Sequence, residues 1–304
     1  GVKTRIGIFG VDDTALRGDC ASGQGRELVT TLELAEMAGK STGIVSTARI
    51  THATPAATYA KSPERNWEND AQLPASAREA GCSDIARQLV DSTATMRDRL
   101  DAPDIDGIDV ILGGGRANFL PEGEGRRRDG DNLIDRWLAQ NPGSVFVDKR
   151  DGLLNAPADA RLLGLFTNSH MSYEQDRPES EPSLKEMTLA ALQRLENNAE
   201  GYFLMVEGGR IDHAHHAGNA SAALRDTIAL SEAVQAAVDR TDNAETLIIV
   251  TADHSHVFTI AGYPRRGNPI LGKLVAVGET EPALAEDGKP YTTLGYANGR
   301  GFRD

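Results

Sequence analysis

Histidine is rare in this 304-residue chain and is concentrated in two short segments. Five of the seven histidines fall within residues 207–216 and 253–256. Each segment directly follows an apolar run typical of a strand, Tyr202–Val206 in the first case and Thr246–Val250 in the second. Ligands of open α/β sheets bind beyond the carboxyl ends of the strands, where both segments are expected. Imidazoles and carboxylates gathered there predict a metal site.

The spacing within the two segments is suited to more than one cation. If the chain enters a helix after Gly209, Asp212 and His216 share one face, roughly 6 Å apart, and can close on one ion. Glu207 can offer its carboxylate to a second, harder cation. The adjacent Asp253 and His254 can meet one metal only from an irregular turn. Mixed imidazole and carboxylate ligands suit catalytic zinc, and oxygen ligands suit magnesium. The alternative is that these segments are ordinary polar loops at strand ends, and it is disfavoured because two such segments occur together.

A third polar group, Thr51–Pro55, follows the apolar run Gly43–Ser46, with Arg65 further along. Taken alone, Thr54 is predicted to be a helix N-cap with Pro55 at the first helical position, and Arg65 a surface arginine.

Short apolar runs alternate with amphipathic segments, a pattern that predicts an α/β domain with a largely parallel sheet. The expected strands are Gly43–Ser46, Asp109–Leu112, Ser144–Val147, Tyr202–Val206 and Thr246–Val250. One helix is expected over 26–38, and a second starts at the capping box Ser183–Glu186. A third, from about Asn219 to Arg240, has an apolar stripe expected to face the core, made of Leu224, Ile228, Val234 and Val238.

Composition excludes some classes of function. The formal charge of −13 gives no long-range attraction to nucleic acid, and no apolar run is long enough to span a membrane.

The run Arg126–Arg128 is interpreted as a solvated loop, and Gly113–Gly115 is weak as a phosphate loop because it lacks the GxGxxG spacing and the Walker lysine. By number alone, Cys20 and Cys82 are either two free thiols or one disulfide.

Four stretches together resemble the alkaline phosphatase family, in its animal branch: Ser46–Ala56, Asp109–Arg116, Val206–His216 and Thr251–Phe258. The similarity covers essentially the whole chain and is strengthened by residues 65–67 and 74–82. It implies a three-layer αβα sandwich around a mostly parallel sheet, and hydrolysis of phosphomonoesters to inorganic phosphate. It also implies an exported protein, periplasmic or secreted, that works as a homodimer.

Carried over residue by residue, the resemblance assigns the candidate site. Two Zn²⁺ and one Mg²⁺ would be held by three pairs of ligands, and Arg65 would hold the phosphate. The pairs are Asp212 and His216 for the first zinc, Asp253 and His254 for the second, and Thr54 and Glu207 for magnesium. His52, His213 and His256 would orient metal or phosphate from beside the ligands, with structural histidines as the alternative. Cys20 and Cys82 align with a disulfide.

Departures from the family pattern matter equally. The nucleophilic serine, which forms the family's phosphoserine, lies in an Asp-Ser-Ala-Ala motif about ten residues before the stretch that matches Gly1–Thr4. That motif is not among the 304 residues, and each metal site lacks one further ligand. We therefore expect negligible turnover from these residues alone, which would form the central portion of a larger protein. Thr167 stands where animal enzymes carry a calcium-binding glutamate, so the presence of a calcium site is left open.

The resulting division is an incomplete alkaline phosphatase-like domain over 1–262, followed by a Gly- and Pro-rich insertion over 263–304 that begins a crown-like region. Two other functions stay open: a non-catalytic zinc-binding homologue, and a related phosphodiesterase or sulfatase. Arg65 argues against the latter pair, since a guanidinium suits the dianionic end of a monoester.

Overall fold

Five parallel strands form the central sheet of the computed structural model, which describes residues 1–298. Their spatial order is β3, β4, β2, β1, β5. The bounds are β1 Ser41–Arg49, β2 Val110–Gly114, β3 Val145–Val147, β4 Leu162–Leu165 and β5 Tyr202–Glu207. Four of these overlap expected strands, whereas β4 was not predicted. Because all neighbouring pairs are parallel, the carboxyl ends of the five strands meet at one edge of the sheet.

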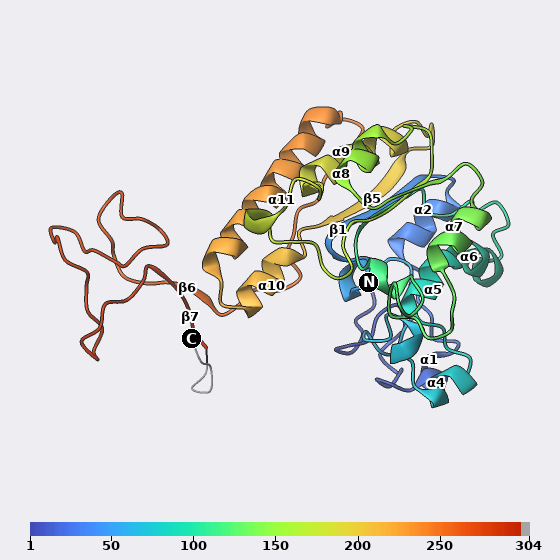
Figure 1. Ribbon diagram of the computed structural model, residues 1–304, viewed down its shortest axis with the longest axis horizontal. Helices are drawn as coiled ribbons and strands as arrows, with labels where there is room; N and C mark the ends of the chain where they lie inside the picture. Colours follow the sequence, from blue (N-terminus) through green and yellow to red (C-terminus); the bar gives the residue numbers. More distant parts are fainter. Residues whose placement is uncertain (299–304) are drawn as a thin grey trace.

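Helices cover both faces of the sheet, so the three-layer αβα architecture is confirmed (Figure 1). Ile44 and Val45 are neighbours in β1, and each is 0% exposed, yet they belong to different core clusters. Successive strand side chains point to opposite faces, which produces this division. The first face is covered by α2 (Thr31–Met37), α5 (Ile85–Val90), α6 (Ser92–Leu100) and α7 (Leu133–Gln140). The second is covered by α8 (Arg150–Asn155), α9 (Leu184–Leu195) and α11 (Ala220–Arg240).

Shorter elements connect these layers and carry several polar residues of interest. The short helices are α1 (Cys20–Gly23), α3 (Ala53–Ala56), α4 (Ala75–Glu79) and α10 (Arg210–His216). Single 3₁₀ turns are η1 (Asp70–Gln72), η2 (Arg116–Asn118) and η3 (Glu174–Asp176).

Two helix starts differ from expectation, and a side-chain cap explains the first of them. The helix expected from residue 26 begins only at Thr31, where Thr30 and Glu33 form a reciprocal capping box. Thr54 lies inside α3 rather than at its N-cap, which is His52. The helix predicted from the Ser183 capping box is confirmed as α9.

The buried stripe of α11 also differs from the prediction, although the helix itself is confirmed. Its core-facing residues include five alanines and Asp226, whereas Ile228 is 58% exposed. This alanine face packs against α9 and α10, because small side chains allow close approach between helices. The expected stripe of larger residues therefore lies beside the interface rather than within it.

The strand expected at Thr246–Val250 is not formed. Leu247 and Ile249 are 84% and 77% exposed, and the segment pairs with no other strand within residues 1–298. An apolar run becomes a strand only when a neighbouring backbone supplies hydrogen bonds, and none lies beside this one in the described part. Along that same described part, β5 pairs with β1 alone and forms an edge of the sheet.

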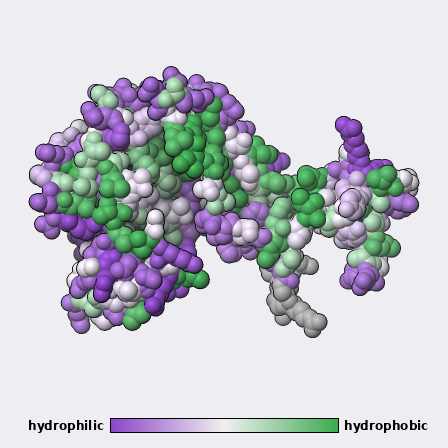
Figure 2. Space-filling model, turned by 180° about the vertical axis from the view of Figure 1, so that it is seen from behind, coloured by the Kyte–Doolittle hydropathy of each residue, from purple (hydrophilic) through white to green (hydrophobic). Residues whose placement is uncertain are grey.

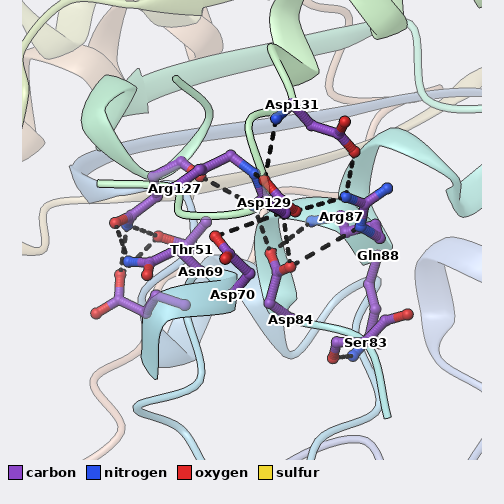
Figure 3. A network of polar contacts seen from close by, with 12 residues as sticks. Thr51, Asn69, Asp70, Ser83, Asp84, Arg87, Gln88, Arg127, Asp129 and Asp131 are labelled. Carbon is purple, nitrogen blue, oxygen red and sulfur yellow. Dashed lines mark hydrogen bonds and ion pairs between the residues drawn. The ribbon is translucent and has the colours of Figure 1, made fainter. Parts of the chain in front are cut away.

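The loop around Arg126–Arg128 contradicts the expectation of a fully solvated arginine run (Figure 3). Arg126 and Arg128 are exposed, but the Arg127 side chain is 0% exposed. Both terminal nitrogens of Arg127 donate hydrogen bonds of 3.0 Å to the carboxylate of Asp84, whose side chain is 3% exposed. Arg127 also pairs with Asp129, which in turn receives a hydrogen bond from Arg87. The loop is therefore held in place by a buried ion pair.

Residues 258–298 form an extended arm that projects from the body (Figure 1). Its only regular pairing among the described residues is the antiparallel pair β6 (Phe258–Ile260) and β7 (Leu294–Tyr296). Apolar surface is visible along this arm as well as on the body (Figure 2), and Tyr263 is 90% exposed. The insertion predicted over 263–304 overlaps this arm, although residues 299–304 lie outside the described part.

Cys20 and Cys82 are joined in a disulfide, with their Cα atoms 5.9 Å apart, as the resemblance implied. The bond ties α1 to the end of α4 beside a small cluster that contains Trp67 and Leu73. No helix within residues 1–298 is both long enough and apolar enough to cross a bilayer.

Candidate metal and phosphate site

The predicted site residues come from three chain segments that meet at the carboxyl edge of the sheet. β1 leads into His52 and Thr54, and β5 ends at Glu207 immediately before α10. The third segment, 253–256, is irregular backbone that folds back toward α10. As expected from the sequence, the helix that begins after Gly209 puts Asp212 and His216 one turn apart.

Asp212 is the centre of one group of ligand atoms. Its Oδ1 lies 2.7 Å from His256 Nε2, 3.4 Å from His216 Nε2 and 3.7 Å from His254 Nε2. Burial raises the pKa of Asp212, but the His256 contact and the neighbouring imidazoles outweigh it and hold the pKa below its usual range. Ligand atoms of Asp212, His216 and His256 all lie within 4.8 Å of one another, close enough to share one metal ion.

Asp253 and His256 differ in how closely they approach this group. Asp253 is 77% exposed on its side chain and contacts His254, with 3.5 Å between Asp253 Oδ2 and His254 Nε2. His256, expected beside the ligands, is the imidazole nearest to Asp212, and its side chain is only 14% exposed. Asp212 thus contacts both its predicted partner His216 and two histidines of the 253–256 segment.

Glu207, which is half-buried, and Thr54, which is exposed, form a second group of oxygen ligands. Ser46 of β1 faces Glu207 of β5 in register, and its hydroxyl donates to Glu207 Oε2 at 2.5 Å. Burial raises the pKa of Glu207, although hydrogen bonds from Ser46 and Thr54 oppose that rise. No lysine or arginine nitrogen lies within 4.0 Å of this carboxylate among the described residues. A buried carboxylate without a cationic partner suits a bound cation.

Arg65 is half-buried rather than a free surface arginine. Its backbone N–H donates to the carbonyl of Gly7, and one terminal nitrogen lies 3.1 Å from His52 Nε2. Within residues 1–298 its guanidinium makes no ion pair with a carboxylate. That leaves its positive charge available to an anion at the sheet edge.

His170 is a further residue of this edge that was not predicted from the sequence. It lies in the loop after β4, in which Thr167 donates its hydroxyl to the carbonyl of Ser169. Its ring centroid is 4.0 Å from that of His213 and 5.1 Å from that of His52. The usable signal was the same one that identified the other histidines, namely a histidine shortly after an apolar run, here Leu162–Phe166.

Burial and nearby arginines keep these three rings neutral. Desolvation is the main cause in each case, and it lowers the pKa of His52 and of His213 to about 4 and that of His170 to about 2. Arg65 and Arg49 add to the effect at His52, Arg49 at His170, and Arg210 at His213.

The arm reaches the site through His215, which contacts Tyr296 and Phe258. His215 Nδ1 lies 2.9 Å from the hydroxyl of Tyr296 in β7, and the His215 ring stacks on His256 at 4.9 Å between centroids. The last turn of α10 is thereby tied to both the 253–256 segment and the arm.

Comparison with known proteins agrees with this geometry. The family model described as alkaline phosphatase matches residues 1–304. The chain is 43% identical to the tissue-nonspecific alkaline phosphatase of Gallus gallus and 41% identical to that of Homo sapiens, covering 100% of this chain and 58% of each relative. An alkaline phosphatase of Gadus morhua is 40% identical over 100% of this chain and 63% of its own length. The chain therefore spans about three-fifths of these relatives.

Solved structures give the same result for the fold. The alkaline phosphatase of Thermus thermophilus superposes with a TM-score of 0.66 at 36% identity, over 87% of this chain and 48% of that one. The enzyme of the Antarctic bacterium TAB5 superposes with a TM-score of 0.65 at 23% identity, over 96% of this chain and 71% of that one. The match over residues 1–304, the curated relatives and the shared fold agree, and this chain belongs to the alkaline phosphatase family.

Proposed function

We propose that the protein containing these residues hydrolyses phosphomonoesters at the carboxyl edge of its sheet, with two zinc ions and one magnesium ion. The observation that carries this proposal is the group around Asp212, where three imidazole nitrogens lie within 3.7 Å of one carboxylate oxygen. Membership of the alkaline phosphatase family supports it.

The residues present fit metal ions. Asp212 and His216 are proposed for the first zinc, Asp253 and His254 for the second, and Thr54 and Glu207 for magnesium. Oxygen and imidazole donors gather around Asp212, and the desolvated Glu207 has no guanidinium or ammonium partner among the described residues, which suits cations at both places. Bound there, the ions would polarise the phosphoryl oxygens and stabilise the charge that develops on attacking and leaving oxygens.

The protein side chains supply orientation. Arg65 is proposed to grip two oxygens of the phosphate with its planar guanidinium, and His52 holds that guanidinium by accepting one of its N–H groups. His213 and His256 orient neighbouring groups, His256 through its contact with Asp212. In the family scheme a serine attacks phosphorus, and the resulting phosphoserine is hydrolysed by water. That serine is not among the 304 residues.

The test compares two polypeptides. The complete gene product, supplied with Zn²⁺ and Mg²⁺, is expected to hydrolyse p-nitrophenyl phosphate and to lose that activity on chelation. A polypeptide of residues 1–304 alone is expected to show negligible turnover, because it lacks the nucleophile and one ligand of each metal site. Turnover of the short polypeptide at a rate typical of a good enzyme would contradict the second expectation.

Other outcomes would select another function. A complete gene product that binds zinc stoichiometrically but hydrolyses no ester would be a non-catalytic zinc-binding protein. Faster hydrolysis of a phosphodiester or of a sulfate ester than of a phosphomonoester would instead show that the protein is a phosphodiesterase or a sulfatase.

The compartment and assembly are proposals as well. The disulfide between Cys20 and Cys82 favours an oxidising environment, so a periplasmic or secreted location is proposed. A homodimer is proposed with the exposed apolar residues of the arm as part of its surface, and the mass measured in solution tests it.

A further inference from the structure

Glu68 is a buried carboxylate that the proposed metal and phosphate sites do not use. It lies three residues after Arg65 and is 6% exposed. Two guanidinium nitrogens of Arg49 donate to it at 2.7 Å, one to each carboxylate oxygen. Its Oε2 also accepts the hydroxyl of Thr51 at 2.6 Å and the side-chain amide of Asn118 at 3.1 Å. Glu68 therefore joins the end of β1 and the turn η2 to the loop that carries Arg65.

These contacts close a ring with Arg65. Thr51, which donates to Glu68, is directly followed by His52, and His52 Nε2 lies 3.1 Å from a terminal nitrogen of Arg65. Residues 65–69 lie outside any helix or strand, and their backbone bonds to Gly7 and to the first turn of α5. Among residues 1–298, no backbone hydrogen bond joins this loop to β1. Side chains alone therefore hold the loop against the end of β1.

Glu68 also distinguishes between two neighbouring cations. It forms a bidentate pair with Arg49, whereas no carboxylate within residues 1–298 lies within 4.0 Å of the Arg65 guanidinium. Glu64, the other carboxylate of this segment, accepts hydrogen bonds from Arg17 at 2.8 and 3.2 Å. Bidentate pairing fixes the orientation of an arginine as well as matching its charge. Arg49 is thus held in place, and the charge of Arg65 is left for an anion.

The contacts of Glu68 are anchored in the buried network of Figure 3. Asn118 is 0% exposed, and its amide nitrogen donates to Thr51 at 2.8 Å, while its side-chain oxygen accepts from Asn69 at 2.9 Å. The backbone carbonyl of Asn118 accepts from Arg127 at 3.3 Å. The Thr51 hydroxyl has one proton, which it donates to Glu68 while it accepts from Asn118. A buried network whose members are paired in this way is rigid.

Glu68 remains ionised although it is buried. Burial raises its pKa, but hydrogen bonds from Arg49 and Thr51 outweigh this and hold the pKa below its usual value. Every contact described above brings a donor to the carboxylate, so only an ionised acceptor matches all of them.

We propose that Glu68 is a positioning residue for phosphate binding, which orients the guanidinium of Arg65 by fixing the loop of residues 65–69 to the end of β1. The proposal rests on the proposed function, in which Arg65 binds the phosphate. Glu68 itself would touch neither phosphate nor metal, because both of its oxygens are occupied by donors of the chain.

Binding of inorganic phosphate to the complete, metal-loaded protein tests the proposal without depending on hydrolysis. Glu68→Gln removes the charge and turns an N–H toward groups that only donate, so the loop loses its attachment. The affinity for phosphate, measured by isothermal titration calorimetry, is expected to fall at least ~10-fold, the lower range for residues that orient a ligand-binding group. Arg65→Ala is expected to cause a larger loss. Adding Glu68→Gln to Arg65→Ala is expected to cause no further loss, because both act through one guanidinium.

Glu33→Gln separates positioning from stability. Glu33 lies on α2, is 1% exposed and pairs with Arg99 and, at 3.0 Å, with Lys61. This matched control is expected to lower the urea midpoint as Glu68→Gln does, but to leave phosphate affinity unchanged. Thr51→Val removes one donor to Glu68 and is expected to weaken phosphate binding ~3-fold, which tests the proposal even where Glu68→Gln does not fold.

Unchanged phosphate affinity in a folded Glu68→Gln or Thr51→Val protein would overturn the proposal. Additive losses in the double variant, or an equal loss in Glu33→Gln, would also overturn it, since they would show a general effect on the fold. If Arg65→Ala leaves phosphate affinity unchanged, the role given to Arg65 in the proposed function fails and the positioning role fails with it. A loss in Arg65→Ala without a loss in Glu68→Gln would refute the positioning role alone.

Discussion

Two arginine-rich clusters of this molecule contrast in how their charges are balanced. Arg127 is completely buried and is matched by Asp84 and Asp129, so the network in Figure 3 closes on itself. At the sheet edge, Arg65 and Arg210 each face an imidazole, and neither has a carboxylate within 4.0 Å in the described part of the chain. Arg210 also lies over the Tyr173 ring. The first cluster has no unmet charge, whereas the second has two.

The difference separates a structural role from a binding role. Burial lowers the pKa of Arg127, but the hydrogen bonds that Arg127 donates to Asp84 and Asp129 outweigh it and raise the pKa above its usual value, as expected for a pair that is stable only while both partners remain. Unmatched guanidiniums, in contrast, stabilise the fold little and remain free to bind an anion. Four substitutions test this contrast.

Arg127→Met is expected to cause the largest loss of stability. It leaves Asp84 buried without its cation, which typically costs about 3–5 kcal/mol. Urea denaturation of the complete protein measures the change. The matched controls Arg126→Met and Arg128→Met, at exposed positions of the same loop, are expected to change stability by less than ~0.5 kcal/mol. Similar losses in all three variants would mean that the loop, and not the ion pair, is responsible.

Glu36→Gln tests a buried carboxyl that has no lysine or arginine partner within the described residues. Burial raises the pKa of Glu36 to about 7, and hydrogen bonds from Thr42 and from the N–H of Gly107 only partly oppose it. Since the pKa is higher in the folded than in the unfolded state, the stability from Glu36 is present at low pH and is lost as pH rises through about 7. Relative to the unsubstituted protein, the variant is expected to gain up to about 3 kcal/mol between pH 4 and pH 8. A pH-independent difference in the urea midpoints would show that Glu36 ionises normally.

Asp212→Asn tests whether the polar residues at the sheet edge serve metal binding rather than stability. It removes the oxygen around which three imidazoles gather, so zinc affinity is expected to fall by more than ~100-fold, the upper range for loss of a supporting residue. Competition with a zinc-binding dye measures the affinity. The metal-free protein is expected to unfold at an unchanged urea concentration, and a marked drop in that concentration would assign Asp212 to the fold rather than to metal binding.

Arg210→Gln is expected to have the smallest effect on stability. Its loss removes the contact with the Tyr173 ring and a hydrogen bond to His213, each worth about 1 kcal/mol. A loss comparable to that of Arg127→Met, measured in the same urea titration, would show that the sheet-edge arginines also serve the fold and would remove the contrast.

Part of this structure could be predicted from the sequence because its signals are local. The i and i+4 spacing of Asp212 and His216 depends only on the helix that carries them, and the capping box at Ser183 and Glu186 requires four consecutive residues. Most expected strands were confirmed for the same reason. The missed strand β4 contains a glycine and only four residues, too short for a clear pattern.

The remaining features were decided by contacts between segments far apart in the sequence. Nothing near Arg127 in the sequence shows that it is buried while Arg126 and Arg128 are exposed, and its buried partner Asp84 lies 43 residues away. Thr246–Val250 has the composition of a strand but lacks a neighbouring backbone in the described part of the chain.

By itself, the sequence determined the family and the helix that carries Asp212 and His216. The tertiary structure alone decided that His170 joins His52 and His213 at the sheet edge. The physical reason is that the charge and protonation of a buried group depend on what surrounds it, and distant segments supply those surroundings.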